Sequence, residues 1–450
     1  MLRRLAFLIT LILVVGACTT GAAEPPSTVS AAGGSTAPGS SPPGSSASVT
    51  DTTTPAVSTT TTQAMPPVTP PDLSGLEELS VEVQKQLEDL IITVQDVRGL
   101  PFLTPPNITV VTDAELEARV RKSIEEEAED FPADDALYKL LGLLDQEADL
   151  EMLLQDLYGA QVAGFYDGET GEIVVPARQD GLTLLQQGTI LHELVHALVD
   201  QHFGFDADFR AMVDEERLDE ATAYQALIEG DATLAEVMWV QSLSQQELGR
   251  FVAEALEVDN SSLDAVPQFI ADSLLFPYDT GLLFVQDLFT AGDWNAINDA
   301  YSTFPGLPGS SEQVITPADY QRDLPLVVEL PTITINGYDL ERTSVWGEGG
   351  FRIMIDQVLG ESKGAKAADG WGGDSYYQWF DGENAAFLLV YKGDTARDLE
   401  ELRSTLLEYA LAAVPDEDFV WVDEEDGVLY FIAADETSVG ELIRSAVGLS

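Results

Sequence analysis

The sequence contains an HExxH motif formed by His192, Glu193 and His196, and all three histidines of the 450-residue chain lie between residues 192 and 202. On an α-helix, the i, i+4 spacing stacks the two imidazoles on one face, where both can bind one divalent ion. Glu193, about 100° around the helix, leaves that face but stays close enough to reach a water molecule on the metal, as a general base must. The motif therefore predicts a hydrolytic metal site with zinc as its ion.

A chance occurrence of the motif, on a helix with structural histidines, is the alternative. The flanking residues favour the metal site, because they supply an apolar helix face and neither proline nor glycine interrupts residues 189–203. A buried helix over this stretch would hold both imidazoles in place. The apolar residues of this face are Leu184, Leu185, Ile190, Leu191, Leu194, Val195 and Leu198.

A catalytic zinc usually takes three protein ligands, so another residue must join the two histidines. His202 stands at the spacing of the metzincin signature HExxHxxGxxH, but Val199 occupies the position of its glycine. A β-branched residue disfavours the turn that this glycine allows, so we expect the helix to continue and to carry His202 about 9 Å along the axis, away from the site. The other candidates are downstream carboxylates: Glu229, and behind it Glu215, Glu216 and Glu220.

Two downstream segments resemble the gluzincin peptidases, the class that includes thermolysin and aminopeptidase N. Residues 229–232, EGDA, are similar to the EGxA sequence in which the aminopeptidase-like branch carries its third zinc ligand. Residues 276–281, FPYDTG, are similar to the PYxxG-like segment of the same branch. The resemblance implies that His192, His196 and Glu229 bind Zn²⁺.

The same resemblance implies the catalytic roles. Glu193 would act as general base, and Tyr278, a neutral phenol at pH 7, would donate a hydrogen bond to the developing oxyanion, a contact worth roughly a few kcal/mol. Asp231 is a candidate to orient a zinc ligand. With the segments SSEQVITP at 310–317 and AADGWGGD at 367–374, most of residues 160–375 resemble a poorly characterised family of secreted or membrane-anchored zinc-peptidase-like proteins of bacteria and archaea.

The chain differs from true aminopeptidases. No GxMEN-like segment precedes the motif, and no carboxylates can be assigned to a substrate's free amine, so an endopeptidase that acts on a peptide or protein substrate is the favoured prediction. A hairpin over residues 161–175 supplies an edge strand that can pair with an extended substrate, or that merely completes the sheet. The alternative function class is a non-catalytic surface lipoprotein that binds peptide or protein on a peptidase fold.

The N-terminal region predicts export and lipid anchoring. Residues 1–17 read as a signal peptide, with a basic start and an apolar run too short for a comfortable transmembrane helix. The run ends in VGAC, which resembles a bacterial lipobox, so Cys18 is expected to carry lipid and to anchor the protein outside the cytoplasmic membrane. Ordinary secretion after cleavage at a nearby alanine is the alternative. Residues 18–72, rich in Ser, Thr, Pro and Gly, predict a disordered tether.

The composition argues against nucleic acid and anionic lipid surfaces as binding partners. Asp and Glu number 78 against 21 Lys and Arg, which gives a formal net charge of −57. Such a charge repels nucleic acid and anionic lipid headgroups. Because the chain has one cysteine, it has no intrachain disulfide.

The periodicity predicts an α+β fold. Residues 73–335 would form a gluzincin-like metallopeptidase domain, with a mixed sheet, an edge hairpin, the active-site helix and a helical subdomain, and residues 336–450 a smaller α+β domain. Residues 307–316 are expected to form a loop; residues 371–374 could line a cleft or form a tight turn, and the turn is favoured. We expect one or two helices within 134–158, further helices at 76–97, 113–127, 215–240, 244–256, 262–275, 281–289, 349–359, 394–413 and 437–446, and strands at 108–111, 327–335, 385–390, 419–422 and 428–432.

Overall fold

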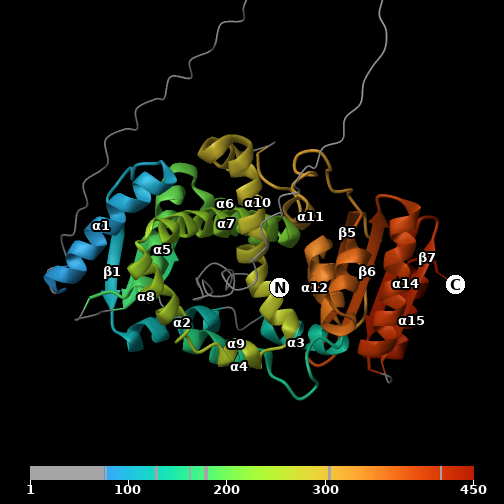
Figure 1. Cartoon of the computed structure of the whole chain (residues 1–450). Coiled ribbons are helices and arrows are strands. Elements are labelled where there is room, and N and C mark those ends of the chain that lie inside the picture. Colours follow the sequence, from blue (N-terminus) through green and yellow to red (C-terminus); the bar gives the residue numbers. More distant parts are fainter. Residues whose placement is uncertain are drawn as a thin grey trace, which may run out of the picture.

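The computed structural model describes residues 76, 79–126, 130–161, 164–176, 181–302, 306–415 and 418–449. The predicted signal peptide, Cys18 and the whole of the predicted tether lie outside these residues. Fifteen helices and eight strands in two sheets lie within them (Figure 1), which confirms the α+β class. Among the described helices, none combines the length and apolar character needed to cross a bilayer.

The first part of the chain forms a small sheet covered by helices. Strand β3 lies in its centre, parallel to β1 on one side and antiparallel to β2 on the other. The hairpin expected over residues 161–175 is therefore present, and β2 is an edge strand. The elements are α1 (Val81–Arg98), β1 (Asn107–Val111), α2 (Asp113–Glu126), α3 (Phe131–Leu140), α4 (Leu150–Gln161), β2 (Phe165–Asp167) and β3 (Glu172–Pro176).

Helices dominate the middle of the chain and of Figure 1. The HExxH helix, α5, begins at a capping box of Thr183 and Gln186 and ends at Gly204, whose φ of +67° suits glycine. Its length confirms that no turn follows Val199. The elements are α5 (Leu184–Phe203), α6 (Phe205–Asp214), α7 (Leu218–Ser242), α8 (Gln245–Ala255), α9 (Ser261–Ala265), α10 (Gln268–Ala300) and α11 (Ser311–Ile315).

Two predictions for this region are wrong. The helices expected at 262–275 and 281–289 are mostly one helix, α10, which continues through Pro277 and leaves helical geometry only at Gly292 and Asp293. The segment around Pro277 packs along α7, and this tertiary packing overrides the tendency of proline to end a helix. The loop expected at 307–316 contains α11, a short helix buried between α7 and α12.

The last part of the chain builds a five-stranded antiparallel sheet, on the right of Figure 1. Its strand order is β4-β5-β6-β8-β7. Side chains of β6 alternate between the main core, which Phe387 joins, and a smaller core on the other face, which Leu388 joins. The elements are β4 (Asp339–Ser344), α12 (Gly347–Leu359), α13 (Glu361–Ala368), β5 (Trp371–Phe380), β6 (Ala385–Gly393), α14 (Ala396–Ala413), β7 (Phe419–Glu425), β8 (Val428–Ala434) and α15 (Thr437–Ala446).

Two predictions for this part are also wrong. Residues 327–335 form no strand; Pro331 interrupts the run and Val327 is exposed. Residues 371–374 are the start of β5 and not a tight turn. Asp374 accepts hydrogen bonds from the backbone N–H groups of Trp346 and Gly347 at 2.7 and 2.9 Å, so it fixes the start of α12.

Four buried carboxyl groups lie where α7, α11, α12 and β5 meet: those of Asp219, Glu312, Glu348 and Asp374. Burial raises their pKa values to about 7, 9, 8 and 6, and for Glu348 the nearby Arg352, at 3.1 Å, offsets this only in part. The backbone N–H of Ser311 donates to Asp219 at 3.2 Å. The segments 310–317 and 367–374 therefore connect the helical middle of the chain to the C-terminal sheet.

These carboxyl groups predict how stability depends on pH. Their raised pKa values mean that the folded protein holds protons that the unfolded chain, with carboxyl pKa values of about 4, releases. The stabilisation is complete below about pH 4 and is lost as the pH rises through the folded values of about 6 to 9. Thermal unfolding should show a melting temperature that falls between pH 5 and 9, less steeply in Glu348→Gln. The exposed control Glu361→Gln should retain the slope; equal slopes in both variants would contradict the assignment.

Candidate metal centre

Helices α5 and α7 bring three potential ligands together. The Nε2 atoms of His192 and His196 lie 3.1 and 3.3 Å from the same atom, Oε2 of Glu229. One ligand atom from each residue lies within 4.8 Å of the others, and all three side chains are buried. The His192, His196 and Glu229 group can therefore hold a metal ion, as the sequence predicted.

Two of the three separations between these atoms suit a small, tetrahedrally coordinated ion. Bonds of about 2.0–2.1 Å at tetrahedral angles place neighbouring ligand atoms about 3.3 Å apart. The two measured separations from Glu229, 3.1 and 3.3 Å, agree with this value. The two imidazole rings stand at 79° to each other with centroids 4.7 Å apart, and the Nε2 atoms of both contact Oε2 of Glu229.

The electrostatics of the group favour positive charge at its centre. Burial alone would lower the pKa of His192, but the adjacent carboxylates of Glu229 and Glu236 outweigh burial and raise it to about 10. Burial would raise the pKa of Glu229, but the two histidines hold it down at about 2. A buried carboxylate in contact with two imidazoles thus stabilises a cation among them.

A close helix crossing places Glu229 there. A Cβ atom on Gly230 would lie 2.2 Å from the carbonyl oxygen of Gly281, and one on Gly281 would lie 2.1 Å from the carbonyl oxygen of Ala226. Only glycine therefore allows α7 and α10 to approach this closely. The glycines of the EGDA and FPYDTG segments touch, so the two segments form one structural unit next to the HExxH helix.

Glu236, which the sequence analysis missed, lies behind the first histidine. Its Oε2 atom is 3.5 Å from Nδ1 of His192, on the opposite side of the ring from Glu229. Glu236 follows Glu229 by seven residues, two helical turns, so both carboxylates lie on one face of α7. The seven-residue spacing of these two glutamates in a buried, mostly apolar helix could have indicated Glu236 from the sequence. A carboxylate in this position fixes the tautomer and orientation of a metal-binding imidazole.

We expect Glu236→Gln to lower zinc affinity about 10- to 100-fold, because it removes the charge that orients His192. Competition with a chelator of known affinity measures the change. Glu220→Gln, on the first turn of the same helix and paired with Arg217, is the matched control and should bind zinc like the wild type. Equal affinities in the two variants would show that Glu236 has no such role.

Asp231 does not occupy the position expected of it. Its carboxylate is buried against Arg98, whose Nε and Nη2 atoms donate to it at 2.7 and 3.1 Å, and the Tyr301 hydroxyl donates at 3.1 Å. Asp231 therefore ties α7 to α1 and α10, and Glu236 contacts the histidine instead. Glu229 and Asp231 are two residues apart, with Gly230 between them, so their side chains point to different sides of α7.

The other ligand candidates lie elsewhere. The Nε2 atom of His202 is 2.7 Å from the carbonyl oxygen of Pro101, so the imidazole joins α5 to the segment after α1. Glu215 and Glu220 form ion pairs with Arg217 at 3.0 and 2.7 Å. Glu216 lies 3.4 Å from Arg342. Glu215, Glu216 and Glu220 therefore pair with arginines and stabilise the start of α7.

The two predicted catalytic side chains lie on α5 and α10. Glu193 is buried on α5, next to His192 in the chain. The half-buried ring of Tyr278 lies 6.2 Å from the ring of His192, at 32° to it. Helix α10 thus brings a phenol ring close to His192. Both side chains therefore lie close to His192.

The edge strand β2 packs on α5. The hydroxyl group of Tyr166, on β2, donates to the carboxylate of Asp200 in the last turn of α5 at 2.7 Å. The other oxygen of Asp200 accepts from the backbone N–H of Asp206 at 3.1 Å. One carboxylate therefore fixes the edge strand and the start of α6 relative to the HExxH helix.

Comparisons with known proteins add little about the chemistry. Residues 336–442 match a family described as a domain of unknown function, DUF8575. A comparison with curated proteins finds no match. Among solved structures, the chain is similar to a crystal structure from Chloroflexus aurantiacus described as "a putative hydrolase with a novel fold", with 16% identity and a TM-score of 0.37 over 54% of this chain and 91% of the other. The matched family thus covers the C-terminal sheet and not the metal centre.

Proposed function

We propose that this protein is a zinc-dependent endopeptidase of the gluzincin type. The observation that carries the proposal is the convergence of two HExxH histidines on one oxygen of Glu229, at 3.1 and 3.3 Å in a buried site. This ligand set, two histidines and a glutamate, leaves a fourth position for water or substrate, as catalytic zinc sites do.

In this proposal, the residues around the site divide the catalytic roles among them. When bound, Zn²⁺ would polarise the scissile carbonyl group and lower the pKa of a water molecule to about 7. The carboxylate of Glu193 would accept the proton of the attacking water and deliver it to the nitrogen of the leaving amine. The hydroxyl group of Tyr278 would donate a hydrogen bond to the carbonyl oxygen as negative charge develops on it. Glu236 would hold His192 in the tautomer that binds zinc.

Strand β2 supports a peptide as the substrate. Its inner edge pairs with β3, and in the described part of the chain no strand pairs with its outer edge. An extended peptide can add to such an edge through backbone hydrogen bonds that do not depend on side chains. Since β2 packs on α5, a peptide held there would run beside the HExxH helix.

The metal content and peptidase activity of the purified protein test the proposal. We expect about one zinc ion per chain and cleavage within a quenched-fluorescence peptide library or casein. Zinc without cleavage would favour the alternative, a peptide-binding lipoprotein on a peptidase fold. A protein that binds no divalent ion would overturn the assignment of the site.

We further propose that Cys18 anchors the protein outside the cytoplasmic membrane through a lipid, on the basis of the lipobox-like VGAC sequence. Cys18→Ser should move the protein from the membrane fraction to the soluble fraction, as immunoblots of fractionated cells would show. Thr19→Ser, one residue further on, should leave the protein with the membrane. If both variants stay with the membrane, the anchor lies elsewhere.

A further inference from the structure

The hairpin of β2 and β3 is fixed to the corner where α5 ends and α6 begins. The hydroxyl group of Tyr166 donates to the carboxylate of Asp200 at 2.7 Å, and the other oxygen of Asp200 accepts from the backbone N–H of Asp206 at 3.1 Å. The hairpin turn lies on the same corner, because a Cβ atom on Gly168 would lie 2.2 Å from Oδ1 of Asp206. We call Tyr166, Gly168, Asp200 and Asp206 the hairpin clamp.

The hairpin clamp lies on the metal face of α5. His192, His196 and Asp200 follow one another at intervals of four residues, so their side chains share one face of the helix. Asp200 stands one turn, about 5.4 Å, beyond the ligand His196. The contact of Tyr166 with Asp200 therefore fixes the edge strand next to the turn that carries a metal ligand.

An aromatic contact gives a second connection to the same histidine. The ring of Phe205 lies 6.5 Å from the ring of Tyr166 and 6.1 Å from the ring of His196, edge to face in both cases. Phe205 follows Gly204, the residue at the corner, and is buried. The hydrogen bond through Asp200 and the packing through Phe205 thus both join strand β2 to His196.

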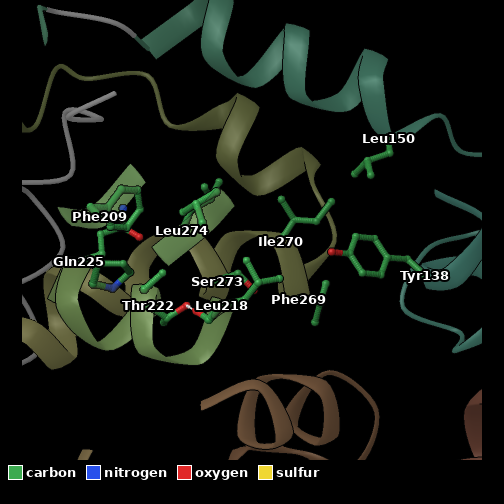
Figure 2. A pocket seen from close by; sticks show the side chains of 13 residues that line it. Tyr138, Leu150, Phe209, Leu218, Thr222, Gln225, Phe269, Ile270, Ser273 and Leu274 are labelled. Atoms are coloured by element: carbon green, nitrogen blue, oxygen red, sulfur yellow. Dashed lines mark hydrogen bonds between the residues drawn. The ribbon is translucent and has the colours of Figure 1, made fainter. Parts of the chain in front are cut away.

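Packing further along α6 is loose. Phe209, one turn after Phe205, is one of the side chains that line an apolar pocket of about 60 Å³ (Figure 2). Empty space provides no partner atoms, so the wall at Phe209 adds less to holding α6 in place than a close-packed contact would. The position of the corner therefore depends strongly on the hairpin clamp.

The chemistry of the Tyr166 contact suits a lasting tie. Burial and the neighbouring carboxylate of Asp200 raise the pKa of Tyr166 well above its ordinary value, so the phenol keeps its proton and donates throughout the neutral range. A hydrogen bond to a carboxylate is shorter and stronger than one between neutral groups. The bond therefore holds β2 at one distance from α5.

We propose that Tyr166 is a positioning residue: through Asp200 it sets the distance between a peptide on the outer edge of β2 and an ion held by His196. The inference rests on the proposed peptidase function and names the residue that aligns its substrate. A peptide paired with β2 moves with the strand, so a shift of the strand moves the scissile carbonyl group relative to the ion. Misplacement of a reacting group by about 1 Å can cost about 100-fold in rate.

Tyr166→Phe tests this role, because it removes only the hydroxyl group. The matched control is Tyr430→Phe, the same change at a half-buried tyrosine of β8 in the other sheet. Asp200→Asn, which leaves one acceptor oxygen for two donors, is a second variant that keeps the test informative if the first does not fold. Zinc content is measured for every variant, since loss of the ion would affect every substrate.

Quenched peptides of two lengths measure the effect. The short peptide contains only the residues beside the cleaved bond, and the long peptide adds three residues, the length of β2, at each end. For the long peptide, Tyr166→Phe should lower kcat about 10- to 100-fold and change KM less than about threefold, because binding to the strand persists while alignment is lost. Asp200→Asn should show a smaller loss of the same kind.

The short peptide, which cannot span β2, should be cleaved alike by Tyr166→Phe, Tyr430→Phe and the wild type. Equal losses of kcat for both lengths would show that Tyr166 only stabilises the fold, and would overturn the inference. An unchanged kcat for the long peptide in Tyr166→Phe would overturn it too.

Binding separates this inference from the peptidase assignment. In the Glu193→Gln background, fluorescence anisotropy measures the affinity for the labelled long peptide without turnover, with zinc bound and after its removal by a chelator. An aligned peptide contacts the ion, so zinc should tighten binding at least about fivefold in Glu193→Gln and less than about twofold when Tyr166→Phe is added. If wild type cleaves no peptide but this difference is found, Tyr166 aligns a bound peptide and the enzymatic function fails. Equal tightening in both proteins would overturn the inference.

Discussion

Replacement of Glu193 by glutamine should lower kcat/KM for peptide cleavage about 10²- to 10⁴-fold while the protein keeps its zinc. Glutamine has nearly the same shape, so the buried α5 helix should be unaffected, but the amide cannot accept the proton of the attacking water. Glu193 follows His192 directly on α5 and is outside the His192, His196 and Glu229 group, so its loss removes a base and not a ligand.

Parallel assays of zinc content and initial rate separate these roles. Glu361→Gln, an exposed substitution on α13, is the control and should match the wild type in both. Glu193→Asp keeps the base but withdraws it by one methylene group, so we expect a rate between those of the wild type and the glutamine variant. Full activity in Glu193→Gln would exclude Glu193 as the base, and loss of zinc would make it a determinant of the metal site instead.

Local spacing was sufficient to predict the centre of the site. The i, i+4 histidines lie on one helix, and the valine at 199 continues that helix, so the positions of His192, His196 and His202 follow from helix geometry alone. The α+β class and the hairpin before α5 also follow from periodicity, since alternation and turn residues are local signals. The place of Glu229 on a second helix required the resemblance, because no local rule brings two helices together.

The parts that sequence analysis missed depend on packing between distant segments. Pro277 suggested a break in α10, but contact with α7 through Gly230 and Gly281 keeps the helix continuous. Asp231 was expected near the histidines, yet Arg98, which is 133 residues away in the chain, holds its carboxylate. The WGGD segment suggested a turn, but pairing with β6 makes it a strand. In each case the deciding partner is remote in sequence, so periodicity carries no information about it.

Removal of the Glu229 carboxylate should have the second large effect, a loss of zinc affinity on the order of 1000-fold in Glu229→Ala. Protein zinc sites bind with about 10–16 kcal/mol, so the loss of one of three ligands removes roughly 4 kcal/mol, or about three powers of ten. This exceeds the 10- to 100-fold change expected for Glu236→Gln, because Glu236 contacts only the far side of His192.

Chelator competition on Glu229→Ala, Glu229→Gln and His202→Ala measures the order of these effects. Glutamine keeps one carbonyl oxygen without the charge, so its affinity should fall between those of the wild type and the alanine variant. His202→Ala should bind zinc like the wild type, since its imidazole contacts the carbonyl oxygen of Pro101 and not the metal group. If His202→Ala lost zinc and Glu229→Ala retained it, the third ligand would be the histidine, and α5 would have to end near Val199 when the metal is bound.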